Sequence, residues 1–227
     1  MEITWLGQAG LLFETNGKKI LVDPYLSNSV AKIEPKNYRR QPIDERFLKI
    51  KPNVIVITHN HADHLDKETL HYYLDEESEV TVLAPSGSWQ ELRKFGGSKN
   101  KYVLFNSATT WTEEFACFRA VKAEHSDEYA IGVIIQAEGK NYYITGDTLY
   151  SERVFDCLPN MEFEMVFLPV NGVGNNMNFI DAQAFVNRIN AKYAVPVHFG
   201  LFDAINGFDI QIKNKKLLNL YQKVEIE

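Results

Sequence analysis

The amino-acid sequence predicts a mixed α/β (α+β) protein in which two β-sheets pack face to face and helices cover their outer faces. Short β-rich runs form one meander at the N-terminus and a second meander after residue 114. Segments with helical spacing follow each meander. Because no linker rich in Gly, Ser or Pro separates the two halves, we expect one domain over residues 1–227.

The first half of the chain is expected to alternate strands and helices after an opening meander. Asn16-Gly17 is a hairpin signal, and the apolar run at 54–57 predicts a strand that is buried on both faces. The polar, Pro-containing stretch at 27–52 predicts an excursion over the surface. The expected strands are 2–6, 11–15, 18–22, 54–57 and 79–83, and the expected helices are 66–74 and 86–95.

The second half is expected to form another meander, whose last hairpin turns at Glu138-Gly139. The region after residue 208 is ambiguous, because leucines at helical spacing precede a strand-like Val-Glu-Ile-Glu tail. The expected strands are 115–123, 130–136, 141–145, 165–169 and 193–197, and one helix is expected at 180–189.

Composition and charge restrict the class of function. A hydrophobic content of 45% excludes a disordered chain, and a net charge of −6 argues against broad nucleic-acid binding. No apolar run reaches the roughly 18 residues that cross a bilayer. Since the chain also opens without a basic, apolar leader, we expect a cytoplasmic protein. Cys117 and Cys157 lie outside any CxxC pattern, so neither a disulfide scaffold nor a thiolate zinc site is expected.

A histidine cluster follows the apolar strand. His59, His61, Asp63 and His64 lie within six residues. Imidazole is a ligand of zinc, iron, nickel and manganese, and a carboxylate adds charge neutralisation. Residues two apart in an extended turn point the same way, so this spacing favours two adjacent metal ions. For an isolated His-x-His, the alternative is a loop whose histidines only form hydrogen bonds.

Three further ligand candidates stand at the carboxyl ends of expected strands. These residues are His125, Asp147 and His198. Loops at such strand ends can converge on one rim of a protein. A catalytic metal needs about three protein ligands and an open position for water, so the histidine cluster requires partners of this kind. Taken alone, Asp147 is interpreted more simply as a turn residue that accepts backbone hydrogen bonds.

The order His-x-His-x-Asp-His, a lone His, Gly-Asp-Thr and Pro-Val-His resembles the metallo-β-lactamase superfamily across nearly the whole chain. The resemblance implies a four-layer αββα sandwich with a metal centre at one edge. It also implies two groups of three ligands, each holding one ion, with Asp147 bridging both ions. The first group is His59, His61 and His125, and the second is Asp63, His64 and His198.

Details of the pattern narrow this resemblance. Family members that open β-lactam antibiotics typically lack the residues matching His64 and Asp147, so a β-lactamase is not expected. Four stretches look like the branch that contains ascorbate-6-phosphate lactonase. This chain is much shorter than that lactonase is expected to be, so the substrate is not carried over. The stretches are 5–10, 21–25, 168–172 and 196–202.

The expected cofactors are two divalent ions, either Zn²⁺ or Mn²⁺, with iron as a third candidate. Ions about 3.5 to 4 Å apart can share a hydroxide and activate it as a nucleophile. Asp63 is expected to orient this hydroxide and to pass its proton to the leaving group. Asp23 matches the family aspartate that contacts a metal-bound imidazole. From spacing alone, Asp23 is equally a strand-terminating residue before Pro24.

Contacts to the substrate are expected from two segments. Asn176 belongs to an amide-rich loop near the expected rim and is a candidate for hydrogen bonding to the substrate. Arg39 is a candidate for clamping an anionic substrate, although a solvated surface pair with Arg40 is the simpler interpretation. Asn178, in the same amide-rich loop, is better explained as the N-cap of the following helix.

The leading hypothesis is a metal-dependent hydrolase that uses a metal-bridging hydroxide to open a lactone or cleave a small anionic ester. One alternative is a phosphodiesterase or nuclease with the same dinuclear centre. Another is a non-catalytic protein that binds a metal or a ligand. The acidic balance and the lack of an evident basic surface count against long RNA or DNA. The expected partner is therefore a small anionic molecule rather than a nucleic acid or a membrane, and a homo-oligomer is compatible with the sequence.

Overall fold

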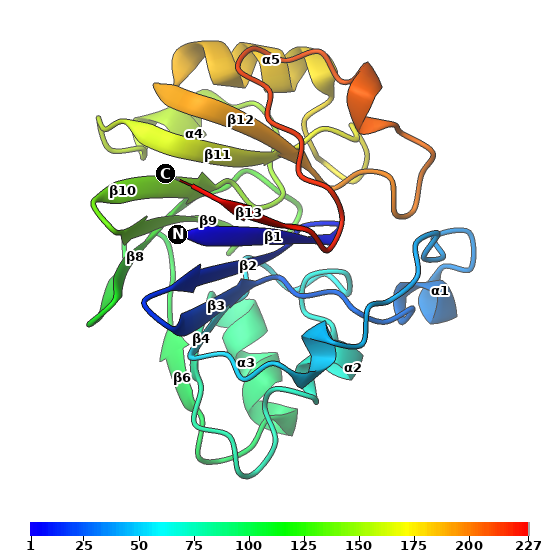
Figure 1. The fold of residues 1–227 in the computed structure, drawn as a ribbon, viewed down its shortest axis with the longest axis vertical. Helices are drawn as coiled ribbons and strands as arrows, with labels where there is room; N and C mark the ends of the chain where they lie inside the picture. The colour runs from blue at the N-terminus through cyan, green and yellow to red at the C-terminus, as the bar shows by residue number, and fades with distance from the viewer. Residues whose placement is uncertain (227) are drawn as a thin grey trace.

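The computed structural model describes residues 1–226, which form four layers. A seven-stranded sheet and a six-stranded sheet pack against each other in the middle of the molecule. Helices α2 and α3 cover the first sheet, and α4 and α5 cover the second (Figure 1). This arrangement confirms the predicted order of helix, sheet, sheet and helix.

The first sheet has the strand order β13-β1-β2-β3-β4-β5-β6. Its strands from β13 to β3 are antiparallel, and those from β3 to β6 are parallel. Strand β4 is buried along its whole length, as its continuous apolar run predicts. The strands are β1 (Glu2–Gly7), β2 (Gly10–Thr15), β3 (Lys18–Val22), β4 (Val54–Val56), β5 (Thr81–Ala84), β6 (Lys101–Leu104) and β13 (Lys223–Glu225).

The second sheet has the strand order β12-β11-β10-β9-β8-β7. Strands β8 to β10 form the predicted antiparallel meander, β7 adds an antiparallel strand at its edge, and β10, β11 and β12 are parallel. The strands are β7 (Thr110–Glu113), β8 (Ala116–Lys122), β9 (Ile131–Ala137), β10 (Lys140–Ile144), β11 (Phe163–Pro169) and β12 (Ala191–Val197).

The helices are short. The predicted N-cap of α5 is confirmed, because the Asn178 side chain accepts hydrogen bonds from the backbone nitrogens of Ile180 and Asp181 at 2.8 and 3.0 Å. No helix in the described part of the chain is long and apolar enough to cross a membrane. The helices are α1 (Val30–Ile33), α2 (Lys67–Leu70), α3 (Ser86–Phe95), α4 (Glu152–Asp156) and α5 (Phe179–Arg188), with 3-10 turns at Phe47–Lys49 and Gly207–Asp209.

The space between the two sheets holds one hydrophobic core, to which both sheets contribute. Phe13 of β2 is fully buried there, and its ring meets Tyr142 and Phe167 of the second sheet at centroid distances of 5.9 and 5.6 Å. A second cluster, which includes Leu70 and Leu92, lies under α2 and α3. Because the two sheets share their main core, we propose that the chain folds as a single domain.

Three strands, two helices and part of a third helix differ from the expectation. Helices α1 and α4 were not expected, since they are only four and five residues long. Strands β6, β7 and β13 were not expected, since each is three or four residues long and at least half of its residues are not buried. Helix α2 ends at Leu70 rather than at residue 74. Beyond it, the nitrogens of Tyr72 and Tyr73 donate to the carbonyls three residues earlier, which converts the helix into tighter turns.

The C-terminal leucines do not form a helix, which resolves the ambiguity of this region. Leu220 instead forms an isolated parallel bridge with Trp5, and Leu218 is buried in the main core. The tail then pairs with β1, where Val224 lies opposite Ile3. Local helical spacing is overridden here by a partner from the opposite end of the chain.

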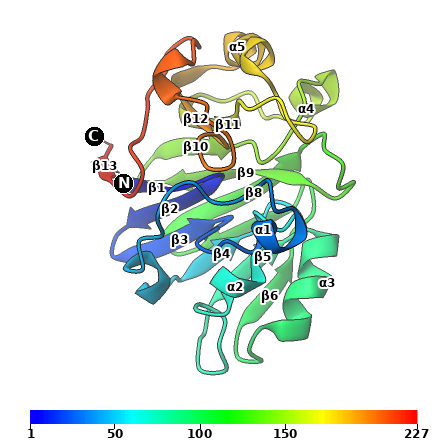
Figure 2. The same cartoon turned by 90° about the vertical axis from the view of Figure 1, so that its right-hand side faces the viewer.

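The loops that follow the parallel strands gather at one edge of both sheets, which faces the viewer in Figure 2. Helix α1 lies in front of this edge and belongs to the excursion at 27–52. The carboxyl ends of parallel strands share an edge, so loops from both sheets can contribute side chains to one site there.

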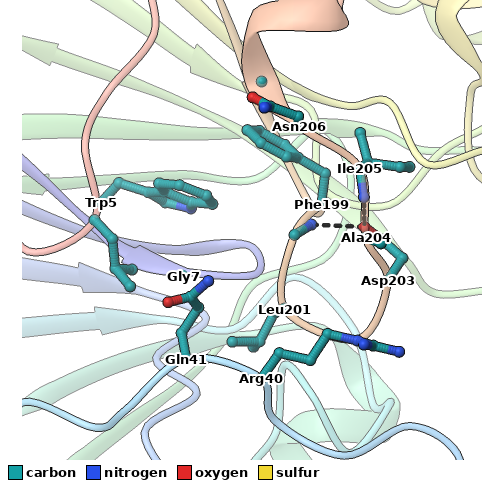
Figure 3. Close-up of a pocket in the computed structure, with 13 residues that line it drawn as sticks. Trp5, Gly7, Arg40, Gln41, Phe199, Leu201, Asp203, Ala204, Ile205 and Asn206 are labelled. Carbon is teal, nitrogen blue, oxygen red and sulfur yellow. Dashed lines mark hydrogen bonds between the residues drawn. The ribbon is translucent and has the colours of Figure 1, made fainter.

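The loop at 199–207, which follows β12, packs against the first strand (Figure 3). The Phe199 ring stacks on Trp5 at a centroid distance of 5.1 Å. Asp203 holds the turn of this loop, because its Oδ1 accepts hydrogen bonds from the nitrogens of Gly200 and Ile205, both at 2.8 Å. The loop thereby borders a cavity of about 460 Å³ on its Trp5 side.

Replacing Phe13 by Ala is expected to lower the free energy of unfolding by about 3–5 kcal/mol, because the cavity would lie between the sheets. Urea denaturation followed by circular dichroism and tryptophan fluorescence measures this change. The matched control is Phe208→Ala, since Phe208 is 76% exposed, and it should stay within about 0.5 kcal/mol of wild type. Two separate transitions, only one of them shifted by Phe13→Ala, would contradict the single domain.

Candidate metal centre

The turn between β4 and α2 carries four of the predicted ligands. The carbonyl of Thr58 accepts a hydrogen bond from Ile131 of the second sheet at 3.0 Å, which fixes the start of the turn between the sheets. The nitrogens of His64 and Leu65 both donate to the carbonyl of His61, at 3.0 and 2.8 Å. The chain reverses at this point, so His61 and His64 contribute to different groups of ligand atoms.

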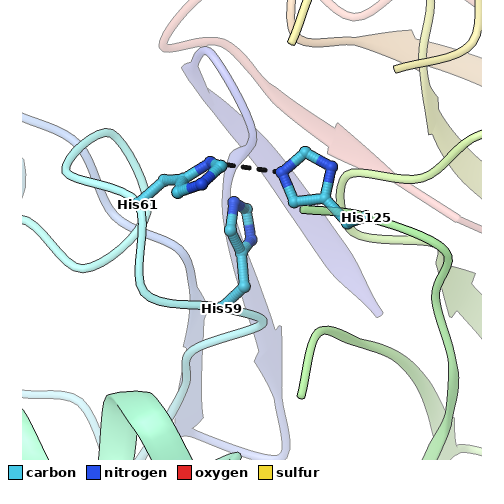
Figure 4. A group of neighbouring side chains, drawn as sticks. All are labelled: His59, His61 and His125. Atoms are coloured by element: carbon cyan, nitrogen blue, oxygen red, sulfur yellow. Dashed lines mark hydrogen bonds between the residues drawn. The ribbon is translucent and has the colours of Figure 1, made fainter. Parts of the chain in front are cut away.

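The first group consists of three imidazoles, from His59, His61 and His125 (Figure 4). The ring centroid of His59 lies 4.6 Å from the centroids of both other rings. His125 Nε2 lies 3.2 Å from His61 Nδ1. Three imidazoles that leave a fourth position open form the ligand set of a catalytic zinc-type site.

The second group consists of Asp63, His64 and His198. Oδ2 of Asp63 lies 3.2 Å from His198 Nε2 and 3.8 Å from His64 Nε2. His198 has a positive φ of 59°, a conformation that costs a non-glycine residue energy. Its backbone nitrogen donates to the carbonyl of Gln8 at 2.9 Å, and this bond to the first sheet helps to hold the strained conformation.

Asp147 joins the two groups. Its Oδ2 lies 3.1 Å from His198 Nε2 and 4.0 Å from His125 Nε2, and its Oδ1 lies 3.4 Å from His64 Nε2. Gly146 lets the backbone pass close to β9 and to the turn after β4, because a Cβ at this position would lie 2.6 Å from the Ile131 carbonyl oxygen and 3.2 Å from Thr58 Cβ. The carboxylate therefore lies between the groups, as expected of a bridging ligand.

Asp23, at the end of β3, makes the contact that the resemblance implied. Its Oδ2 accepts a hydrogen bond from His64 Nδ1 at 2.7 Å. The backbone nitrogen of Thr58 donates to Oδ1 at 2.8 Å, and the Thr58 hydroxyl also donates to the carboxylate. Because Asp23 occupies Nδ1, His64 presents Nε2 to the centre.

Two amide side chains at the centre, those of Gln8 and Asn171, make contacts with the candidate ligands that the sequence did not predict. Gln8 Nε2 donates to Asp63 Oδ2 at 2.8 Å and lies 3.1 Å from His198 Nε2. Asn171 Nδ2 lies 3.0 Å from His198 Nδ1. Both residues belong to stretches that resemble the lactonase branch, but these contacts join residues far apart in the chain. The positive φ of Gln8, 50°, marks a tight turn between β1 and β2.

The two expected substrate contacts are placed differently. Asn176 is buried at the edge of the centre, where its Nδ2 donates to Asp147 Oδ2 at 2.8 Å and its Oδ1 accepts from Thr148 N at 3.1 Å. It therefore orients a candidate ligand. Arg39 lies away from the centre, and its Nη1 donates to the Tyr25 carbonyl at 2.7 Å. Its guanidinium fastens the excursion to the core.

Burial and neighbouring carboxylates shift the pKa values of the histidines in opposite directions in the two groups. Burial lowers the pKa of His59 well below its usual value and also lowers the pKa of His125, so these rings are neutral. Burial opposes the charged form of His198, but the carboxylates of Asp147 and Asp63 outweigh it and raise its pKa to about 10. The same two carboxylates and Asp23 raise the pKa of His64 well above its usual value despite burial.

The residues present fit a cation. The Nε2 atoms of His59 and His64 are buried and lack a hydrogen-bond partner, although His64 Nε2 lies 3.4 Å from an oxygen of Asp147. A buried polar atom without a partner costs about 1–3 kcal/mol. His59 belongs to the first group and His64 to the second. Together with Asp147, the two histidines also form a third possible group of ligands. Metal ions bound by these groups would satisfy both atoms.

A cavity of about 460 Å³ opens directly onto the centre. His61, Asp63, Asp147 and His198 form its floor. Its walls come from helix α1 and from the loops that follow β11 and β12. A small molecule in this cavity would contact both groups of candidate ligands.

The sequence matches the model of the family described as the beta-lactamase superfamily domain over residues 2–198. This match includes all seven candidate ligands. The chain belongs to the beta-lactamase superfamily. A superfamily relative from Staphylococcus epidermidis, named UPF0173 metal-dependent hydrolase, is 28% identical over 230 residues, which cover 94% of this chain and 92% of the relative.

Solved structures show the fold of the superfamily. The metallo hydrolase Igni18 from Ignicoccus hospitalis has a TM-score of 0.77 at 18% identity, with 100% of this chain and 98% of that chain covered. The metallo-beta-lactamase fold protein YhfI from Bacillus subtilis has a TM-score of 0.72 at 15% identity, with 99% of each chain covered. The predicted αββα fold of the metallo-β-lactamase type is therefore confirmed.

Replacing Asp23 by Asn is expected to weaken Zn²⁺ or Mn²⁺ binding by about 10- to 100-fold, because His64 loses the carboxylate that orients its ring. Isothermal titration calorimetry measures the affinity. The control is Asp66→Asn, since Asp66 is equally buried at 1% exposure but caps α2 and is not one of the candidate ligands. Equal affinities for wild type and Asp23→Asn would contradict this role.

Metal binding is expected to release protons. Below pH 10 the His198 ring is protonated in the metal-free protein, and the His64 ring, with its raised pKa, is also protonated at neutral pH. A cation must displace these protons, so its apparent affinity should rise from pH 6 to 8 by up to about tenfold per pH unit for each proton. Calorimetry in buffers of different ionisation enthalpy counts the protons. Metal binding to the His198→Gln variant should release about one proton fewer than binding to wild type. A metal affinity independent of pH would contradict the protonation of His64 and His198.

Proposed function

We propose that this protein is a metal-dependent hydrolase with a dinuclear centre, which opens a lactone or cleaves a small ester. The observation that carries the proposal is that Asp147 joins two three-residue groups on the floor of one cavity. The names of the staphylococcal relative and of the Ignicoccus protein, both hydrolases that use metal, support it. The four stretches that resemble the lactonase branch favour a lactone among the esters.

The residues of the centre have separate tasks. Divalent ions bound there would activate a water molecule and polarise the substrate oxygen. The neutral rings of His59 and His125 are ready to act as ligands without losing a proton. Asp147, fixed by Asn176, holds the two groups together.

We assign the proton transfer to Asp63. Its carboxylate is part of the cavity floor, and Gln8 fixes the position of its Oδ2. As water attacks the acyl carbon and the bond from this carbon to the leaving oxygen breaks, Asp63 accepts the proton of the water. It then passes this proton to the leaving oxygen. The reaction thus consumes one water molecule and leaves the carboxylate unchanged.

Chelation and reconstitution test the proposal. Removing metal with a chelator should abolish turnover of a panel of lactones and aryl esters, and Mn²⁺ or Zn²⁺ should restore it, because the centre supplies the nucleophile. Turnover that the chelator leaves untouched would contradict the proposal. Preferential turnover of bis-para-nitrophenyl phosphate would instead indicate a phosphodiesterase. Two retained ions without any turnover would indicate a binding protein.

A variant of Asp63 belongs to the same experiment. Asp63→Asn should lower kcat by about 10²–10⁴-fold, because the amide cannot accept the proton. Metal analysis of the same sample separates this effect from loss of an ion. Asp181→Asn is the control, because Asp181 lies in the first turn of α5, away from the cavity.

A further inference from the structure

We infer that the substrate of this site is an uncharged ester or lactone with an aliphatic segment, and not an anion. The inference rests on the proposed function and names the class of substrate for the same cavity. Three observations lead to it. Exposed apolar side chains form part of the cavity wall, the charged side chains of the wall are acidic, and the neighbouring arginines are engaged elsewhere.

The apolar part of the cavity comes from helix α1 and from the loops after β11 and β12. Ile33 of α1 is 71% exposed, and Val173 of the loop after β11 is 68% exposed, yet both line this cavity. Val30 and Phe202 also line the cavity and add further apolar surface. Large apolar side chains held in solvent beside a reactive centre indicate a surface that a ligand covers. They would pack on an aliphatic segment while the ester group lies on the floor.

Apart from His198, a candidate metal ligand, the charged residues of the cavity are acidic. Glu34 and Asp203 line its walls, in addition to Asp63 and Asp147 on the floor. Among the described residues that line it, none is Lys or Arg. The four carboxylates balance the charge of two divalent ions, so the filled centre would not present a net positive field to an anion.

The two nearest arginines do not serve this cavity. The Nη1 of Arg39 donates to Tyr25 and its Nε donates to the carbonyl of Gln41 at 3.0 Å. Arg40 lines the other cavity, on the Trp5 side of the loop at 199–207 (Figure 3). Its Nε donates to the carbonyl of Phe202 at 3.2 Å. A carboxylate or phosphate on the substrate would therefore find no cationic side chain in the walls.

This result changes the expected substrate. The sequence predicted an anionic ester, with Arg39 as the candidate clamp. The acidic residues of the cavity wall favour an uncharged ester instead. An anionic group near Glu34 or Asp203 would be repelled, whereas an uncharged chain would lose little on entering.

Paired esters test the inference. The metal-loaded protein is assayed with para-nitrophenyl butyrate, which is uncharged, and with mono-para-nitrophenyl succinate, which is anionic and of similar length. After correction for spontaneous hydrolysis, kcat/KM should be at least about tenfold higher for the uncharged ester. Equal or better turnover of the succinate ester, or a preference for a trimethylammonium ester of the same length, would overturn the inference but leave the hydrolase intact. Hydrolysis of none of these esters and of no lactone in the panel would overturn the proposed function itself.

Variants of residues that line the cavity test whether these residues cause the preference for the uncharged ester. Glu34→Lys should reduce the ratio of uncharged to anionic turnover by about 3- to 10-fold, because it replaces a repulsive charge by an attractive one. The matched control is Glu114→Lys, an equal change at an exposed turn before β8 that should leave the ratio unaltered. Ile33→Ser should raise KM for the butyrate ester, while Ile180→Ser, at a residue that is 80% exposed outside the cavity, should not. An unchanged ratio in Glu34→Lys would overturn the role of the wall charges.

Discussion

The structure depends on two buried imidazole nitrogens that lack a hydrogen-bond partner. His59 and His64 are fully buried, and each has its Nδ1 occupied by a neighbouring side chain. Their Nε2 atoms are left without partners, in a region where an unpaired polar group is costly. Two cations, one in each group, would relieve this cost, so the stability of the fold and the binding of metal are coupled.

The fold meets this constraint by bringing loops from both sheets to one edge. Asp23 from the first sheet and Asp147 from the second approach the same imidazole, that of His64, from opposite sides. Positive φ values at Gln8, Asp23 and His198 show that the backbone is strained at this edge. The rigid core between the sheets holds these conformations, which isolated loops would not adopt.

The sequence predicted the parts of this structure that depend on local pattern. The apolar run of β4, the ligands within the turn that follows it and the N-cap Asn178 are each set by neighbouring residues. Contacts across the chain were not predictable in this way. Gln8 meets Asp63 across 55 residues, and the amide of Asn176 donates to Asp147 across 29 residues. Both outcomes depend on which loops the sheets bring together.

Anomalous diffraction from crystals soaked in Mn²⁺ or Zn²⁺ tests the central claim most directly. We predict two peaks per chain, one among His59, His61 and His125 and the other among Asp63, His64 and His198, with the Asp147 carboxylate between them. A soaked crystal in which the seven side chains are placed as described but no peak appears among them would contradict the account.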